Sequence, residues 1–200
     1  MDGTSGPGKS HKKPAQTRKN HAREFVKQIQ WPEGFSIEQL NKRHRRTVFC
    51  SGLDIVDEWL KKRAHQAQEK QLAVTRILLK KRNVIAGYYT LAMGQVNFDE
   101  LPHEMARKLP RTLLPIITLA WLGVDKHYQG KGFGERILAQ ALADCYHTGQ
   151  LMPFVAVLLD CATVSAKTFY QRYDFDELPG HPMKLMLPWK LLSRMMEKTE

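Results

Sequence analysis

Residues 121–134 read WLGVDKHYQGKGFG, and the fold of the chain is predicted outward from this stretch. The first four of these residues are the end of a continuous apolar run, Ile116–Val124. Such a run is expected for a strand that is buried on both faces. The glycines that follow allow the backbone to turn sharply and to approach a ligand without a Cβ in the way. A helix is predicted next, from about Phe133 to Thr148. Its apolar stripe consists of Ile137, Leu138, Ala141, Leu142 and Cys145.

The glycine-rich turn between this strand and helix has the properties of an anion-binding site. The free N–H groups of the turn and of the first helical turn point one way, with the helix dipole behind them. Such a socket suits a pyrophosphate, and Lys131 adds a positive charge. The spacing Gln129-x-x-Gly132-x-Gly134 differs from the GxGxxG of dinucleotide-binding folds, and the acidic residue those folds use for a ribose is missing. Taken alone, the turn is also compatible with a packing role.

Strands alternate with helices through the rest of the chain, which predicts a mixed α/β sheet. A capping box at 51–54 begins a helix, and the strand-like runs 72–79 and 84–93 follow, joined by a polar turn. Beyond the central helix we expect a strand at 154–159, a helix at 163–173 and a last strand at 184–187.

A second informative stretch, residues 165–175, reads SAKTFYQRYDF. The order of a strand, a QxxGxG turn, a helix, a strand and a helix ending in a Phe-Tyr pair resembles the GNAT acetyltransferase superfamily. The resemblance implies the GNAT fold. This is an α/β fold with a mixed, twisted central sheet of about six to seven strands flanked by helices, in which a splayed strand pair holds acetyl-CoA.

The same resemblance assigns roles to individual residues, with acetyl-CoA as the co-substrate. Tyr170 would face the thioester sulfur, and a hydroxyl with a pKa near 10 can act as general acid toward the leaving thiolate. A purely structural role for Tyr170, as a core residue beside Phe169, is the alternative. A backbone N–H near Val124 would stabilise negative charge on the carbonyl oxygen. The contacts implied for acetyl-CoA are Leu122, Gly123, Val124, Gln129, Gly130, Lys131, Gly132, Phe133, Gly134 and Ser165.

Shorter motifs narrow the resemblance to the GNAT toxins of bacterial toxin–antitoxin pairs. These motifs are FCSG at 49–52 with DEWL at 57–60, GYYTLA at 87–92 and LMLP at 185–188. The resemblance implies an enzyme that acetylates the α-amino group of aminoacyl-tRNA, blocks translation and is restrained by a small ribbon-helix-helix antitoxin. One departure concerns the acceptor, because this chain has Trp121 where the family commonly shows an arginine.

Positive charge is concentrated at the start of the chain. Residues 1–46 hold eleven Lys or Arg and four Asp or Glu, so they carry +7 of the net +11. We predict a flexible basic extension over 1–46, either a solvated tail or an arm that grips a phosphate backbone, before an acetyltransferase domain at 47–200. The segment Gly3–Ser10 fits GxxxxGK[ST], but only two residues precede it, so the buried strand that a phosphate loop needs is missing.

Composition restricts the remaining possibilities. The N-terminus lacks the apolar stretch of a secretory signal, and three widely spaced cysteines favour reduced thiols, so a cytoplasmic protein without a metal site is expected. His103 and His127 are expected near the cleft, although an α-amine with a pKa near 7.7–8.0 needs no dedicated base. The basic residues that we consider as phosphate contacts are Lys80, Lys81, Arg82, Arg107, Lys108 and Arg111.

Two other functions stay open from the sequence. The first keeps the fold and changes the acceptor to a protein or small-molecule amine. The second is a non-catalytic nucleic-acid-binding module, for which salt-sensitive binding without turnover is expected. A homodimer is also open, because the apolar face predicted on the last helix would suit either the core or a dimer contact. That face consists of Trp189, Leu192, Met195 and Met196.

Overall fold

A computed structural model describes residues 31–81 and 83–197 of the chain. Its strands are β1 (Phe35–Gln39), β2 (Val74–Lys80), β3 (Val84–Asn97), β4 (Leu113–Val124), β5 (Ala156–Asp160), β6 (Asp176–Leu178) and β7 (His181–Pro188). Its α-helices are α2 (Asp54–Glu58), α3 (Ala64–Glu69), α4 (His103–Ala106), α5 (Phe133–Leu151), α6 (Val164–Gln171) and α7 (Trp189–Met196). Short 3-10 turns are η1 (Arg46–Val48), η3 (Phe98–Glu100) and η4 (Lys126–Tyr128), and η2 (Trp59–Arg63) is a π-helix.

The seven strands form one mixed sheet in the order β1-β2-β3-β4-β5-β7-β6. β4 and β5 pair in parallel, and every other neighbouring pair is antiparallel. A parallel pair needs a long crossover connection, and the chain supplies it as the 19-residue helix α5. The predicted α/β class and the predicted six to seven strands are therefore confirmed.

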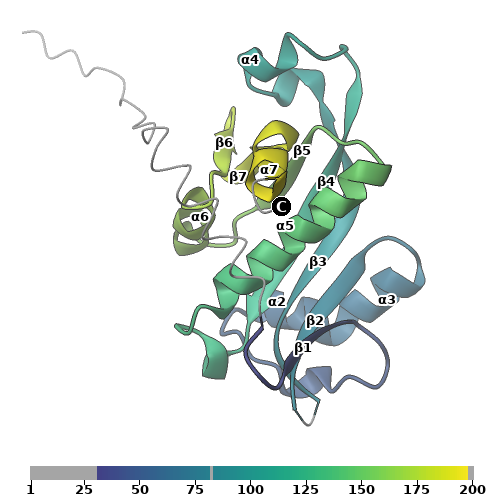
Figure 1. The fold of residues 1–200 in the computed structure, drawn as a ribbon, viewed down its shortest axis with the longest axis vertical. Helices are drawn as coiled ribbons and strands as arrows, with labels where there is room; N and C mark the ends of the chain where they lie inside the picture. The colour runs from purple at the N-terminus through teal and green to yellow at the C-terminus, as the bar shows by residue number, and fades with distance from the viewer. Residues whose placement is uncertain (1–30, 82, 198–200) are drawn as a thin grey trace, which may run out of the picture.

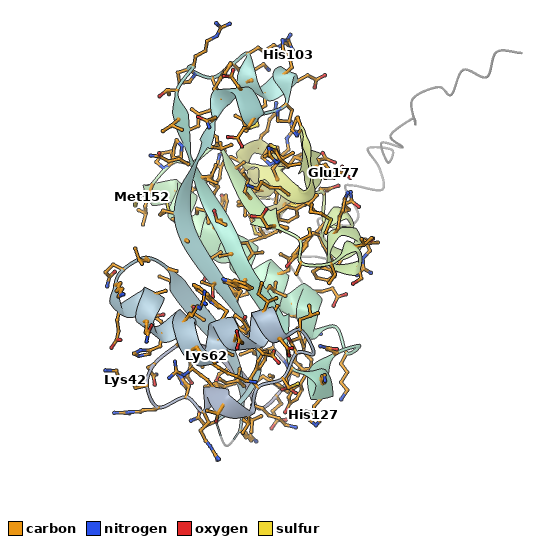
Figure 2. All side chains as sticks on the ribbon, turned by 180° about the vertical axis from the view of Figure 1, so that it is seen from behind. Lys42, Lys62, His103, His127, Met152 and Glu177 are labelled. Atoms are coloured by element: carbon orange, nitrogen blue, oxygen red, sulfur yellow. The ribbon has the colours of Figure 1, made fainter. Side chains whose placement is uncertain are left out.

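Helices cover both faces of this sheet. α5 and α7 lie on one face, whereas α2 and α3 lie on the other, as the views from opposite sides show (Figures 1 and 2). The α5 face holds the largest buried apolar cluster, with Ile137, Leu138 and Leu142 fully buried. The α2 face holds a second cluster built around Leu60, Phe49 and Tyr88.

The last helix contributes to the first of these clusters. Leu192, Met195 and Met196 are buried, and Trp189 stacks on Tyr146 of α5 with ring centroids 5.6 Å apart. The face of α7 that could have served a dimer contact is therefore part of the core.

The N-terminal boundary of the sheet differs from the prediction. β1 pairs with β2 over Phe35↔Lys80 to Gln39↔Arg76, so the folded domain begins before residue 47. The sequence pattern does not reveal this strand because it is short and polar, with only Phe35, Ile37 and the buried Leu40 anchoring it. Most of the predicted extension, including the segment 3–10, lies outside the described residues.

The predicted capping box at 51–54 is also wrong. Leu53 is the N-cap of α2 and has no side-chain cap. The Ser51 hydroxyl instead donates to Asp57 Oδ1 at 2.6 Å, and the Ser51 N–H donates to the same oxygen at 2.8 Å. Asp57 lies in α2, one turn after its first residue, Asp54. Its carboxylate therefore holds the segment before α2 against the helix.

Candidate active site

The sheet splits where the resemblance places the ligand. β4 pairs with β5 only over Ile116–Thr118, opposite Ala156–Leu158, although β4 continues to Val124. A bulge in β4 accompanies the split, because Thr90 pairs with Trp121 while Leu91 pairs with Leu119, which leaves Ala120 as the extra residue. Beyond Thr118, one edge of β4 thus faces a gap instead of a neighbouring strand.

Backbone N–H groups of β4 point into this gap. The Asp125 N–H donates to the Ala86 carbonyl oxygen of β3 at 2.9 Å. Because successive residues of a strand direct their N–H groups to opposite sides, those of Val124 and Leu122 point away from β3 and into the gap. The gap therefore offers fixed donors at the position predicted for the carbonyl oxygen of the thioester.

Gly123 lies between these two residues and has a packing role. A Cβ built on Gly123 would lie 2.8 Å from both Tyr88 Cε1 and Val56 Cγ1. Any side chain here would push α2 away from the sheet, so the residue type is set by packing even though its backbone borders the gap.

The turn after β4 presents backbone at the start of α5. Gly130 and Gly132 have φ values of +70° and +77°, and no atom lies within 4 Å of a Cβ built on either residue. Gly132 is the N-cap of α5 and carries no side chain to occupy the N–H groups of the first turn. This open cradle at a helix N-terminus fits the pyrophosphate of acetyl-CoA.

Other predicted contact residues support the turn through their side chains. The Gln129 amide donates to the carbonyl oxygens of Ser51 at 2.7 Å and Val124 at 2.9 Å, and Lys131 Nζ donates to the His127 carbonyl oxygen at 2.8 Å. Phe133 is buried, and the centroid of its ring lies 4.8 Å from that of Phe35. For Gln129 and Phe133, the backbone is what faces a ligand.

Helix α6 lies beside the start of α5. Phe169 is the nearest side chain to Gly134, 3.7 Å from a Cβ built there, and Arg172 lies 3.8 Å from Glu135. Ser165 is exposed in the first turn of α6, where its hydroxyl lies 3.0 Å from Thr163 Oγ1. The predicted turn and the predicted Phe-Tyr helix are thus brought together, with Ser165 at the far end of α6 from Tyr170.

Tyr170 lies at the inner side of α6 and is buried. Burial raises the pKa of its hydroxyl, and the nearby Cys161 thiol adds to the effect. The pKa of Tyr88 is also raised, mainly by burial and further by the nearby Asp57 and Tyr170. Tyr88 pairs with Gly123 across β3 and β4.

The centroid of the Tyr170 ring lies 5.1 Å from that of Phe169, and a Cβ built on Gly134 would lie 3.7 Å from Phe169 and 3.9 Å from Val124 Cγ2. Helix α6 therefore brings Tyr170 close to the end of β4, and its hydroxyl stays protonated at neutral pH.

Asp125 is a supporting residue that the sequence analysis missed. Its carboxylate accepts from the Cys50 N–H at 2.9 Å and the His127 N–H at 3.0 Å, and His127 Nδ1 lies 2.8 Å away. The Lys126 N–H completes the junction by donating to the Cys50 carbonyl oxygen at 2.8 Å. An acidic residue directly after a buried strand was the available signal for this role.

The two histidines considered as bases do not share the site. His103 lies in α4, at the opposite end of the molecule from His127 (Figure 2). The expectation that both border the cleft is wrong for His103, because the β3–β4 hairpin carries α4 far beyond the split in the sheet.

The predicted basic contacts do not form a single patch either. Lys80 and Lys81 lie at the β2–β3 turn, whereas Arg107, Lys108 and Arg111 lie around α4 at the other end of the molecule (Figure 1). Arg82 is outside the described residues. A surface cavity of about 560 Å³ beside the β2–β3 turn is lined by Phe35, Asn41, Arg43, Lys80 and Lys81 among others, and it is separate from the gap.

The described residues contain no group of three or more His, Cys, Asp or Glu side chains arranged to hold a metal ion. Among the helices of residues 31–81 and 83–197, none has the length and hydropathy of a membrane span.

Comparison with known families agrees with this geometry. The family model for the acetyltransferase (GNAT) domain matches residues 76–177, which run from β2 to β6 and include both the turn and Tyr170. The chain therefore belongs to the GNAT acetyltransferase family and is an acetyl-CoA-dependent N-acetyltransferase.

Comparison with individual proteins gives more specific matches than the family model does. The tRNA-acetylating toxin of Mycobacterium tuberculosis (strain ATCC 25618 / H37Rv) is 32% identical over 144 residues, covering 72% of this chain and 86% of the relative. The fold matches AtaT complexed with acetyl-methionyl-tRNAfMet, with a TM-score of 0.75, 22% identity and coverage of 81% and 99% of the two chains. It also matches a mutant of the AtaT toxin bound to acetyl-CoA and the C-terminus of the antitoxin AtaR, with a TM-score of 0.70, 18% identity and coverage of 84% and 100%.

Proposed function

We propose that this protein is a toxin of a toxin–antitoxin pair that acetylates the α-amino group of aminoacyl-tRNA and so blocks translation in the cytoplasm. The observation that carries the proposal is the 32% identity to a tRNA-acetylating toxin over 72% of this chain. A net charge of +11 agrees with a polyanionic acceptor. An antitoxin partner is a further part of the proposal, supported by the likeness to AtaT bound to its antitoxin AtaR, and we expect it to be of the ribbon-helix-helix type.

The chemistry follows from the groups that border the gap. The amine nitrogen attacks the thioester carbon, and the negative charge that develops on the carbonyl oxygen is stabilised by the N–H of Val124 or Leu122. The C–S bond then breaks, and the sulfur takes the Tyr170 hydroxyl proton. The proton released from nitrogen restores the hydroxyl. Tyr170 starts each cycle protonated, and its raised pKa means that proton donation must be coupled to the departure of the sulfur.

Acetyl-CoA is held by the turn that follows β4. The backbone of Gln129–Gly134 and the N-terminus of α5 bind the pyrophosphate, while Leu122–Val124 align the arm that carries the thioester. Asp125 and the Gln129 amide keep this turn fixed against the segment before α2.

Transfer of labelled acetyl from acetyl-CoA in a translation extract tests the proposal. We expect label on aminoacyl-tRNA and inhibited translation with the wild type, and a rate lower by about 100-fold or more for Tyr170→Phe. Tyr146→Phe is the matched control, because Tyr146 also packs in an aromatic stack but lies near the C-terminal end of α5, away from the turn. Label on protein or on small amines would keep the enzyme class and refute the toxin assignment, and full activity in Tyr170→Phe would refute the mechanism.

A further inference from the structure

Two tryptophans stack on the face of the sheet opposite α5. The Trp59 and Trp121 rings are nearly parallel, with centroids 5.2 Å apart and an interplanar angle of 17°. Both side chains are half-buried and pack against the α2-face cluster. Trp121 lies three residues beyond Thr118, where pairing with β5 ends, so its strand edge faces the gap.

A buried hydrogen-bond chain fixes this stack. Trp59 Nε1 donates to Thr90 Oγ1 at 3.1 Å, and Thr90 Oγ1 lies 2.9 Å from Thr75 Oγ1. Both threonines are fully buried, so the indole of Trp59 is held by the sheet itself. Thr90 also pairs with Trp121 across β3 and β4, which places both tryptophans around one residue.

The helix that carries Trp59 changes its winding at this residue. α2 ends at Glu58, and the π-helix η2 runs from Trp59 to Arg63 before α3 resumes the α-helical winding. Figure 2 shows Lys62 of η2 on the helical segment that covers this face of the sheet. Short π-helical turns are uncommon and occur frequently at functional sites, because they redirect side chains relative to a regular helix.

The geometry leaves this face for the acceptor. The pyrophosphate turn, Gly134 and Phe169 lie toward α5 and α6, so acetyl-CoA occupies that side of the gap. An amine that approaches the thioester from the other side meets Trp121. Along a strand, Trp121 lies about 10 Å from Val124, a distance that an indole and an amino-acid side chain can bridge together. The terminal base of a tRNA is separated from the reacting amine by the ester and the ribose, and lies further away.

We propose that the Trp59–Trp121 stack is the specificity wall of the acceptor site and selects aminoacyl groups with a large, uncharged apolar side chain. The inference rests on the proposed function. An indole face attracts apolar groups by removing their surface from water, whereas it offers an acidic side chain no partner. We define Trp59 and Trp121 as the acceptor wall, which the buried Thr90 orients from inside the sheet.

The test measures kcat/KM for acetylation of purified tRNAs charged with Met, Leu, Phe, Gly, Asp or Lys. We expect the wild type to favour the large apolar group over Gly and Asp by at least about tenfold, since one or two methylene groups in an apolar site already discriminate to that extent. Trp121→Ala and Trp121→Arg should reduce this ratio to within about threefold, with Trp121→Arg improving the rate with Asp. A ratio of two acceptors is independent of the fraction of folded enzyme.

Trp189→Phe is the matched control, because Trp189 is also stacked, on Tyr146, but lies away from the gap. Its acceptor ratio should equal that of the wild type. A wild type that favours Gly, Asp or Lys, or a ratio that survives both Trp121 substitutions, overturns the acceptor wall while leaving the toxin activity intact. If no charged tRNA is acetylated by the wild type, the proposed function fails and the acceptor wall fails with it.

Discussion

The turn proposed to hold acetyl-CoA and the acceptor wall are built by opposite means. The turn, Gln129–Gly134, presents backbone from a single segment, and its glycines leave open space around Gly130 and Gly132. The acceptor wall presents side chains from two elements that are distant in the chain, η2 and β4, and a buried residue of β3 orients them. A shared co-substrate can be bound by backbone alone, whereas choice among acceptors needs side chains whose identity can differ between relatives.

Asp125 ties the segment that leads into the turn to the segment before α2, and its replacement should have the largest effect on stability. Asp125→Asn exchanges one acceptor oxygen for a donor that faces the N–H groups of Cys50 and His127. We expect a loss of about 2 kcal/mol in the free energy of unfolding at pH 7, because hydrogen bonds to charged groups are lost. Urea unfolding of the wild type and of Asp125→Asn measures this loss. Asp176→Asn is the control, because Asp176 is exposed.

The effect should depend on pH in a defined direction. Burial alone would raise the pKa of Asp125, but the hydrogen bonds from Cys50 and His127 outweigh burial and hold the pKa below its usual value. The stabilisation is therefore complete above the unfolded pKa, about 3.9, and is lost as the pH falls through the lower folded pKa. An Asp125→Asn difference as large at pH 2 as at pH 7 would contradict this account.

Gly132→Ala is a smaller change that separates strain from ligand binding. Gly132 and Gly180 have almost the same φ, +77° and +78°, and an added Cβ contacts nothing at either position. Each alanine should cost about 1–2 kcal/mol of stability from the left-handed conformation. Only Gly132→Ala should also weaken acetyl-CoA binding, by about tenfold, because its methyl group competes with a ligand held against the backbone. Calorimetric titration with acetyl-CoA measures the affinity. Equal affinities in Gly132→Ala and Gly180→Ala would refute the assignment of the turn as the acetyl-CoA site.

The contrast between the two regions also explains what the sequence could predict. Strand β4, the glycine-rich turn and α5 are continuous in the chain and carry their own periodicity, so their bounds were predicted closely. The split beyond Thr118 was expected only through the family resemblance. The short strands β1 and β6 were missed, because β6 has only three residues and the apolar–polar alternation of β1 covers only Phe35–Glu38.

The acceptor wall was out of reach of such reasoning. Trp59 fits an ordinary apolar stripe of a helix, and nothing in the spacing predicts a π-helix or a partner 62 residues away in Trp121. Trp121 was noted only as a departure from the family pattern. Pairings between distant elements depend on how the helix is seated on the sheet, and that is fixed by packing such as the close fit of Gly123 under Val56 and Tyr88.

The smallest predicted effect concerns the hydrogen bond that orients the stack. Trp59→Phe keeps an aromatic ring against Trp121 but removes the Nε1–H donor, and Thr90 Oγ1 still has Thr75 Oγ1 at 2.9 Å as a partner. Because no buried polar group loses its last partner, we expect a cost of only about 0.5–1.5 kcal/mol in thermal melts. The acceptor ratio should persist, since selection by the wall depends on the aromatic face. If Trp59→Phe abolished the ratio as fully as Trp121→Ala, an aromatic ring at position 59 would be insufficient, and selection would depend on the orientation that the bond to Thr90 gives the stack.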